Sequence, residues 1–282
     1  MTGEALLNHE PTIRLGAFFS IFAVMALWEL AAPRRALTVS KRLRWFSNLG
    51  VVILNTVLAR LILPMAPVVF ATLAMKNGWG VFNLLDWNGW LELALAVIVM
   101  DFAIWLQHVM VHAIPLLWRL HRMHHADLDF DVTTGARFHP IEIILSLGIK
   151  FAVIALIGAS PVAVLVFEVL LNATAMFNHS NVKLPLGLDA VLRLFVVTPD
   201  MHRVHHSIHV NETNSNFGFN LPWWDRLMGT YTAQPQDGHE TMTIGLNQFR
   251  KARDERLDQM LIQPFRSSAL GYAINRRLGD KP

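Results

Sequence analysis

Cysteine is missing altogether from the 282 residues of the chain. Its absence excludes disulfides, thiolate-ligated haem, iron–sulfur clusters and every zinc site that needs a thiolate. Charged residues are also scarce, because they make up 16% of the chain, against about 25% in an ordinary soluble domain. The formal net charge of +3 is too small to suggest nucleic-acid binding.

Apolar residues account for 53% of the chain, and the mean hydropathy is +0.37. A bilayer span needs about 20 mostly apolar residues, and four runs approach or exceed that length: 13–28, 49–75, 93–114 and 143–177. Pro64 and Pro67 should break or kink the second run. The last run is too long for one span, and Gly158 to Pro161 predicts the turn of a helical hairpin. We therefore expect an all-α, multi-pass transmembrane bundle of four or five membrane helices with a histidine-rich helical cap.

Basic residues follow the first span, the third span and the hairpin, and they include Arg34, Arg35, Lys41, Arg42, Arg44, Arg119, Arg122, Arg137, Lys183, Arg193 and Arg203. If the spans alternate, these loops share one side, and the positive-inside rule makes that side cytoplasmic. The histidines and the C-terminus are then expected in the cytoplasm and the N-terminus outside. No cleavable signal and no endoplasmic-reticulum retrieval signal is recognised, so a bacterial inner membrane is preferred over the endoplasmic reticulum.

Three regions are expected along the chain. Residues 1–89 supply the N-terminal membrane helices, 90–232 the catalytic membrane helices and cap, and 233–282 a cytoplasmic tail. In this tail the spacing of apolar residues predicts a surface helix built on Leu246, Phe249, Leu257, Leu261 and Ile262.

Histidine is over-represented, with 13 in the chain. Eight of them form three groups at helical spacing: His108 and His112; His121, His124 and His125; and His202, His205 and His206. Imidazole suits iron, zinc, copper and nickel, and eight ligands exceed what one ion can take. Adjacent histidines point about 100° apart on a helix, which two neighbouring ions can use. The groups therefore predict two metal ions, with His179 as an additional ligand and His139 and His209 left open.

These motifs resemble the sterol desaturase/fatty acid hydroxylase superfamily of integral membrane di-iron enzymes. The resemblance covers about residues 90–232 and includes Arg137-Phe-His-Pro-Ile-Glu142, Phe177-Asn-His-Ser-Asn181 and the stretch from Asn216 to Tyr231. It implies two iron ions, O2 as co-substrate and hydroxylation or desaturation of a membrane lipid such as a sterol or fatty acyl chain. It also implies electrons from a separate donor, a b-type cytochrome or a ferredoxin with its reductase. No dinucleotide-binding glycine motif is recognised, which agrees with a separate reductase.

Carboxylates near the histidines are candidates to hold the free imidazole N–H groups. Asp127, Asp129, Asp131 and Asp200 are the nearest in sequence, although most are expected to be solvated loop residues. Asp101 falls inside the third span. A charge there is costly and usually has a function, so we consider a position near the active site for Asp101. Snorkelling or mutual pairing is the alternative for the other intramembrane charges, Arg60, Lys150 and Glu168.

Two other classes compete with the oxygenase. A membrane metal transporter or metal-binding protein would place histidines across several spans at mid-bilayer depth, whereas these histidines follow span ends. A zinc hydrolase needs only three protein ligands and an open position, and eight histidines exceed that number. The substrate lipid, the oxidised carbon and the oligomeric state stay open.

Overall fold

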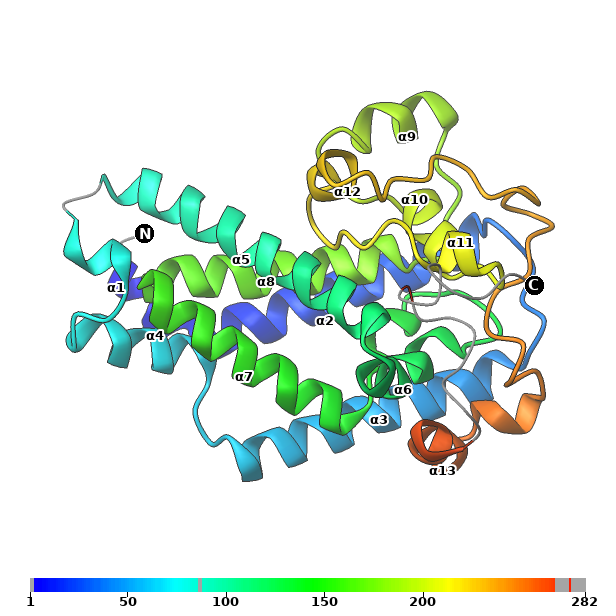
Figure 1. Ribbon diagram of the computed structural model, residues 1–282, viewed down its shortest axis with the longest axis horizontal. Coiled ribbons are helices and arrows are strands. Elements are labelled where there is room, and N and C mark those ends of the chain that lie inside the picture. The colour runs from blue at the N-terminus through cyan, green and yellow to red at the C-terminus, as the bar shows by residue number, and fades with distance from the viewer. Residues whose placement is uncertain (1–2, 86–87, 267–273, 275–282) are drawn as a thin grey trace.

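The structure, a computed structural model, describes residues 3–85, 88–266 and 274, and this part of the chain is helical without any β-strand. The membrane part contains α1 (Gly3–Asn8), α2 (Glu10–Ala31), α3 (Lys41–Ile62), α4 (Pro67–Lys76), η1 (Val81–Leu84), α5 (Gly89–Ala113), α7 (Pro140–Ile157) and α8 (Pro161–Asn178). The cap contains α6 (Pro115–His125), η2 (Thr134–Ala136), α9 (Leu186–Leu192), α10 (Pro199–His205), α11 (Val210–Thr213), α12 (Trp223–Leu227), η3 (Ala252–Glu255), α13 (Leu257–Ile262) and η4 (Gln263–Phe265). Figure 1 shows the long helices side by side, with the cap at one end of them.

Five stretches within the described residues are long and apolar enough to cross a membrane. They are α2, the segment Lys41–Leu84 that holds α3 and α4, α5, α7 and α8. The break between α3 and α4 lies at Leu63 to Ala66, where the prolines predicted it. The expected all-α multi-pass bundle is confirmed, and the chain is an integral membrane protein.

The turn between α7 and α8 shows how local sequence sets the helix ends. Gly158 ends α7 in the left-handed conformation with φ 75°, which glycine adopts at little cost. Ser160 then caps α8 by accepting a hydrogen bond from the backbone N–H of Ala163. Gly80 packs against this turn so closely that a Cβ there would lie 2.1 Å from the Gly158 nitrogen. The predicted hairpin therefore exists, and two glycines let the preceding loop contact it.

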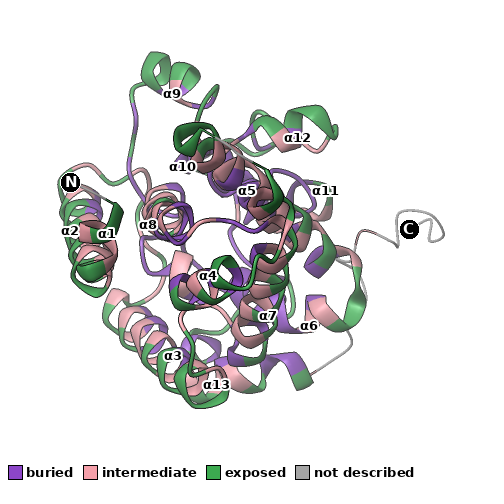
Figure 2. Cartoon of the chain, turned by 90° about the vertical axis from the view of Figure 1, so that its left-hand side faces the viewer, coloured by how far each residue is buried: buried purple, intermediate pink, exposed green. Residues whose placement is uncertain are grey.

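The long helices differ in how much they face lipid. Only 11% of the apolar window of α2 is buried, against 44% for α8, so α8 is central and α2 peripheral. Figure 2, viewed along the bundle, shows buried residues toward the middle and exposed residues on the outer helix faces. The beginning of α2 lies at the end of the bundle opposite the cap (Figure 1). The cap and this N-terminal part therefore lie on opposite sides of the spans.

The loop after α6 is the main correction to the sequence-based expectations, because its acids are buried rather than solvated. Arg44 of α3 donates to both carboxylate oxygens of Asp127 at 2.6 and 2.8 Å and to Asp131 at 2.5 Å. Burial disfavours the charged form of Asp127, but the charges of Arg44 and Arg137 and the hydrogen bonds from Arg44 and Thr134 together outweigh it and lower the pKa to about 2. Asp129 accepts from the backbone N–H groups of Thr38 and Val39 at 2.9 Å. These acids tie the loop to the start of α3.

The tail was predicted as a surface helix, and this prediction is wrong for most of its described residues. Among these residues only α13 is α-helical, and Leu246 and Phe249 are buried in a non-helical stretch that packs on Trp118 of α6. Glu255 pairs with Arg137 and accepts from the backbone N–H of Leu128 at 3.0 Å. The tail therefore covers the cap. Residues 267–273 and 275–282, including the expected cytoplasmic C-terminus, lie outside the described residues.

Removing the Arg44 cation should destabilise the protein strongly. Arg44→Met leaves Asp127 and Asp131 buried without this partner, and breaking a buried ion pair in this way costs about 3–5 kcal/mol. We expect a large fall in the midpoint of thermal unfolding in detergent. Arg42→Met, an exposed position on the same helix, is the control and should leave the midpoint unchanged. Equal midpoints for the two variants would contradict a structural role for the ion pair.

Candidate metal centre

Nine histidines meet where α5, α6, α8 and α10 end at the cap. His108 and His112 lie in the last turns of α5, and His179 directly follows α8. The other six belong to α6 and α10 or to the residue after α10: His121, His124, His125, His202, His205 and His206. None of the nine is more than 3% exposed. A cluster of imidazoles is thus enclosed by protein at the membrane end of the cap.

The histidines form two groups in which one ring nitrogen of each residue lies within 4.8 Å of the others. One group holds His108, His112, His121, His125 and His205, and the other holds His124, His179, His202 and His206. Each adjacent pair contributes one ring to each group, because neighbouring side chains on a helix diverge. The structure brings together all nine residues predicted as ligands. Their ligation of metal stays a prediction.

Hydrogen bonds fix the protonation of three rings in the larger group. His108 Nδ1 lies 2.7 Å from the Phe217 carbonyl, and His205 Nδ1 lies 2.6 Å from the Ser215 carbonyl. His121 Nδ1 lies 2.6 Å from a carboxylate oxygen of Glu142. Because these oxygens only accept, each Nδ1 must carry the proton. The Nε2 atom of each neutral ring then presents a lone pair.

These lone pairs face one another. His108 Nε2 lies 3.1 Å from His121 Nε2 and 3.0 Å from His205 Nε2. Two acceptors at this distance repel unless a cation lies between them. An ion held at about 2.0–2.1 Å from imidazole nitrogen, the zinc value, brings neighbouring ligand nitrogens to about 3.0–3.4 Å. The donor set and its spacing therefore fit a metal ion.

The smaller group has the same character. His179 Nδ1 donates to the Ala175 carbonyl at 2.8 Å, so its Nε2 is free to face His124 at 3.2 Å and His202 at 3.1 Å. Burial lowers the pKa of His179 to about 3 and holds that of His202 well below its ordinary value. His206 is buried, and neither of its ring nitrogens has a hydrogen-bond partner among the described residues. Neutral buried imidazoles with free nitrogens are the form that binds metal.

The other candidates lie outside both groups. His139 caps α7, with Nδ1 accepting from the backbone N–H of Ile141 at 3.3 Å. His209 Nε2 lies 2.6 Å from Asp237. Asp101 accepts from the Trp224 indole at 2.8 Å and from the Leu221 backbone, so it positions the cap segment rather than a histidine. Asp200 likewise pairs with Arg34 and Arg203.

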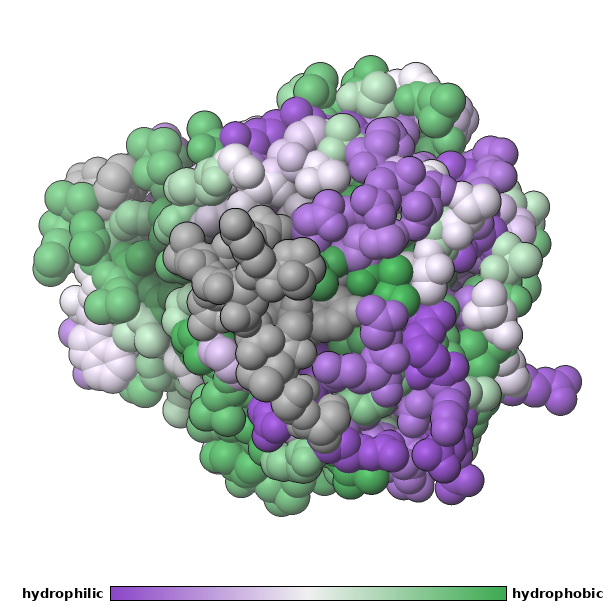
Figure 3. All heavy atoms as spheres, turned by 45° about the vertical axis from the view of Figure 1, so that its right-hand side comes forward, coloured by the Kyte–Doolittle hydropathy of each residue, from purple (hydrophilic) through white to green (hydrophobic). Residues whose placement is uncertain are grey.

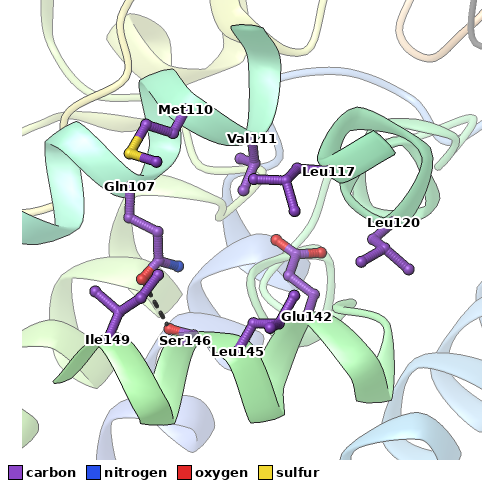
Figure 4. A pocket seen from close by; sticks show the side chains of 9 residues that line it. All are labelled: Gln107, Met110, Val111, Leu117, Leu120, Glu142, Leu145, Ser146 and Ile149. Atoms are coloured by element: carbon purple, nitrogen blue, oxygen red, sulfur yellow. Dashed lines mark hydrogen bonds between the residues drawn. The ribbon is translucent and has the colours of Figure 1, made fainter. Parts of the chain in front are cut away.

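Glu142 is a histidine-bound carboxylate of the cluster that sequence reasoning missed. Its motif was noted, but its partner His121 is 21 residues away, so spacing alone could not reveal the pair. Figure 4 shows its side chain pointing from α7 toward a small space lined by Val111, Leu117 and Leu120. A carboxylate bound to the N–H of a metal-facing histidine fixes the ring orientation and makes the ring a better ligand. Asn214 Oδ1 lies 3.2 Å from Nδ1 of His112 and is placed to do the same.

A cavity of about 840 Å³ leads from this cluster into the bundle. His108, His121 and Glu142 line one end, and Val111, Leu147, Leu171, Met176 and Phe219 line its apolar walls. Arg14, Lys150 and Glu168 also line it. Glu168 pairs with Lys150 and lies 3.5 Å from Arg14, so mutual pairing explains these intramembrane charges. Arg60 of α3 lines the same cavity.

Gly135 offers a test of His179 that leaves every imidazole in place. A Cβ at Gly135 would lie 2.7 Å from the Ala175 carbonyl oxygen and 3.1 Å from His179 Nδ1. Gly135→Ala should displace His179, and losses of about 10–100-fold in metal affinity follow when a ligand's supporting contacts are disturbed. Metal analysis of the purified variant measures this. Gly148→Ala, where a Cβ meets nothing within 4 Å, should keep its metal. Full metal retention in Gly135→Ala would exclude His179 as a ligand.

Comparison with known proteins agrees with the site. Residues 93–230 match the fatty acid hydroxylase family. The ornithine lipid hydroxylase OlsE of Rhizobium tropici is 30% identical over 151 residues, covering 54% of this chain and 45% of that protein. Human alkylglycerol monooxygenase is 29% identical over 174 residues, covering 61% and 38%, and human cholesterol 25-hydroxylase is 27% identical over 133 residues, covering 46% and 47%.

The matched part of the chain thus spans less than half the length of these curated relatives. No solved structure matches. The matched residues include all nine clustered histidines together with Glu142 and Asn214. The family match over residues 93–230, the relatives and the buried histidine cluster together support membership of the sterol desaturase/fatty acid hydroxylase superfamily.

Proposed function

We propose that this chain is an O2-dependent di-iron enzyme that hydroxylates an unactivated C–H bond of a membrane lipid. One observation carries the proposal. Two enclosed groups of imidazoles, several with their lone pairs facing one another, lie at the end of a cavity that runs among membrane-spanning helices. This arrangement would hold redox-active metal ions next to hydrocarbon. The names of the relatives, two hydroxylases and a monooxygenase, support the same reaction class.

The larger histidine group would hold one iron ion and the smaller group the other. Iron is preferred to zinc because zinc has no redox chemistry, and attack on an unactivated C–H bond needs an oxidant formed from O2. The nine-histidine ligand set favours this over a zinc hydrolase, which needs three protein ligands. It also disfavours a metal transporter, because the histidines lie together at one end of the spans rather than along a path through the bilayer.

The protein's own residues are proposed to orient the ligand histidines, bind the lipid and exclude bulk water. Glu142 holds the proton on His121 Nδ1 and keeps Nε2 directed into the site. Burial of the rings excludes bulk water from the metal. The apolar walls of the cavity orient an alkyl chain toward His108 and His121, while the charged residues Arg14, Lys150 and Glu168 can bind a polar part of the same molecule. An amphipathic lipid suits both kinds of wall.

The names of the relatives agree on the class of reaction but not on the substrate. Their names refer to an ornithine lipid, an alkylglycerol and cholesterol, three different lipids. Hydroxylation is therefore preferred over desaturation, and the lipid is left as a class. The bacterial relative supports a bacterial inner membrane, and the basic residues near the cap support a cytoplasmic cap. We keep residues 90–232 as the catalytic part, 1–89 as N-terminal membrane helices and 233–282 as the tail.

Electrons are proposed to come from a separate donor, a b-type cytochrome or a ferredoxin with its reductase. The chain shows no recognised dinucleotide-binding motif, and hydroxylation with O2 consumes two electrons besides those of the C–H bond. The donor should dock on the cap, because the metal ligands lie there.

His205→Ala tests the proposed function directly. The variant removes one ligand of the larger group, so we expect lower iron content and loss of lipid-dependent O2 uptake when a reductase and donor are supplied. His209→Ala is the control, because His209 follows on the same segment and lies outside both groups. It should keep wild-type iron content and O2 uptake.

Iron content, O2 uptake and hydroxylated lipid should be measured on the same preparations. Wild-type turnover by His205→Ala would refute the ligand assignment. A wild-type enzyme that holds two irons but oxidises no lipid under these conditions would count against the lipid substrate.

A further inference from the structure

Two short helices of the cap, α9 and α12, present an unusually apolar outer surface. Large exposed side chains of this segment are Leu186, Leu188, Val191, Leu194, Phe195, Trp223, Leu227 and Met228. Leu186 is 77% exposed and Leu227 is 72% exposed. Figure 3 shows hydrophobic surface at the top of the molecule, where α9 lies, beside the hydrophilic surface of the cap. We call these eight residues the apolar face. Contiguous apolar surface of this kind marks an interaction site.

Charged side chains of the same segment turn away from this face. Asp189 and Arg193 belong to α9 and its C-terminal end, and both are buried and paired with each other. Arg193 also donates to the Ala233 carbonyl at 2.9 Å. Arg226 is exposed, but its guanidinium lies over the Tyr231 ring, 4.1 Å from the centroid. Charges inside and apolar groups outside are the reverse of a water-facing surface.

The position of α12 along the bundle shows what surrounds this face. The Trp224 indole donates to Asp101, the central residue of α5, and the Trp105 indole donates to Asp225 at 3.1 Å. These bonds hold α12 alongside a membrane-spanning helix rather than beyond its end. Trp223 donates to the Leu194 carbonyl at 2.8 Å, which joins α9 to α12. The apolar face is therefore continuous with the lipid-facing surface of the spans.

We propose that α9 and α12 insert into the bilayer from the cap side as a monotopic element, with the apolar face in contact with lipid acyl chains. The element also carries the exposed side chains of Trp223 and Arg226, and indole and guanidinium groups can bridge hydrocarbon and headgroups. The chain continues from α9 directly to α10, which carries His202 and His205. Insertion therefore fixes the depth of the metal-ligating helix relative to the membrane. The proposal does not depend on which reaction the centre performs.

The absence of cysteine makes a direct test possible, since each single-cysteine variant of the full chain has one thiol. Nitroxide labels at Leu194→Cys and Leu227→Cys report on the apolar face in proteoliposomes. Leu61→Cys, on spanning helix α3 and 73% exposed, is the lipid-facing control. Lys183→Cys, an exposed position three residues before α9, is the water-facing control. Unchanged metal content and elution volume show that each labelled variant is folded.

Collisional relaxation by O2 and by a water-soluble nickel chelate is then compared. We expect the O2-to-nickel ratio at Leu194 and Leu227 to match Leu61 and to exceed Lys183 several-fold. A ratio equal to that of Lys183 would overturn the proposal, because the face would then contact water. Low accessibility to both reagents with spin–spin broadening between labels would also overturn it, because the face would then bind a second copy of the chain.

Discussion

Nine imidazoles buried together are the constraint on which the rest of the structure depends. Protein oxygens fix the proton of His108, His121, His179 and His205 on Nδ1. This leaves the Nε2 lone pairs turned toward one another at about hydrogen-bond distance. Such a cluster is unfavourable as a polar core and favourable as a ligand set. The protein must therefore supply enough packing around it to hold the rings together.

That packing comes from parts of the chain that carry no metal-binding motif. Arg44 of α3 binds the acids that follow α6, and Glu255 of the tail binds Arg137 and the loop backbone at Leu128. The histidine-bearing helices are thus clamped between the second membrane segment and the tail. The buried ion pairs do not add stability merely by being present, but each would be costly to break.

The sequence predicted local features well and distant partners poorly. Helical spacing identified eight of the nine clustered histidines, and the family resemblance supported His179 as the ninth. Gly158 to Pro161 located the hairpin turn. Asp127, Asp129 and Asp131 look like solvated acids because their main hydrogen-bond partners are distant in sequence. Arg44, the partner of Asp127 and Asp131, is 83 residues from Asp127, and Thr38, a partner of Asp129, is 91 residues away. The prediction of a surface helix in the tail failed for a similar reason. Leu246 and Phe249 have loosely helical spacing, but they pack against Trp118, which is distant in sequence. Periodicity reports which residues are apolar, not which surface they cover.

The position of the centre follows from two demands that conflict. A lipid's C–H bond lies in hydrocarbon. Imidazole ligands need a polar protein environment, because their Nδ1–H groups donate hydrogen bonds to protein oxygens. The structure meets both by placing the histidines at the ends of α5 and α8, with the cavity on one side and the cap loops on the other. The ligand helices α6 and α10 lie outside the spans, so their depth is not set by a transmembrane segment of their own. Contacts from α12 to Asp101 and Trp105 in α5 provide that reference. Asp101, for which its place inside a span suggested a position near the active site, instead binds the Trp224 indole and the Leu221 backbone and so joins the cap to the bundle.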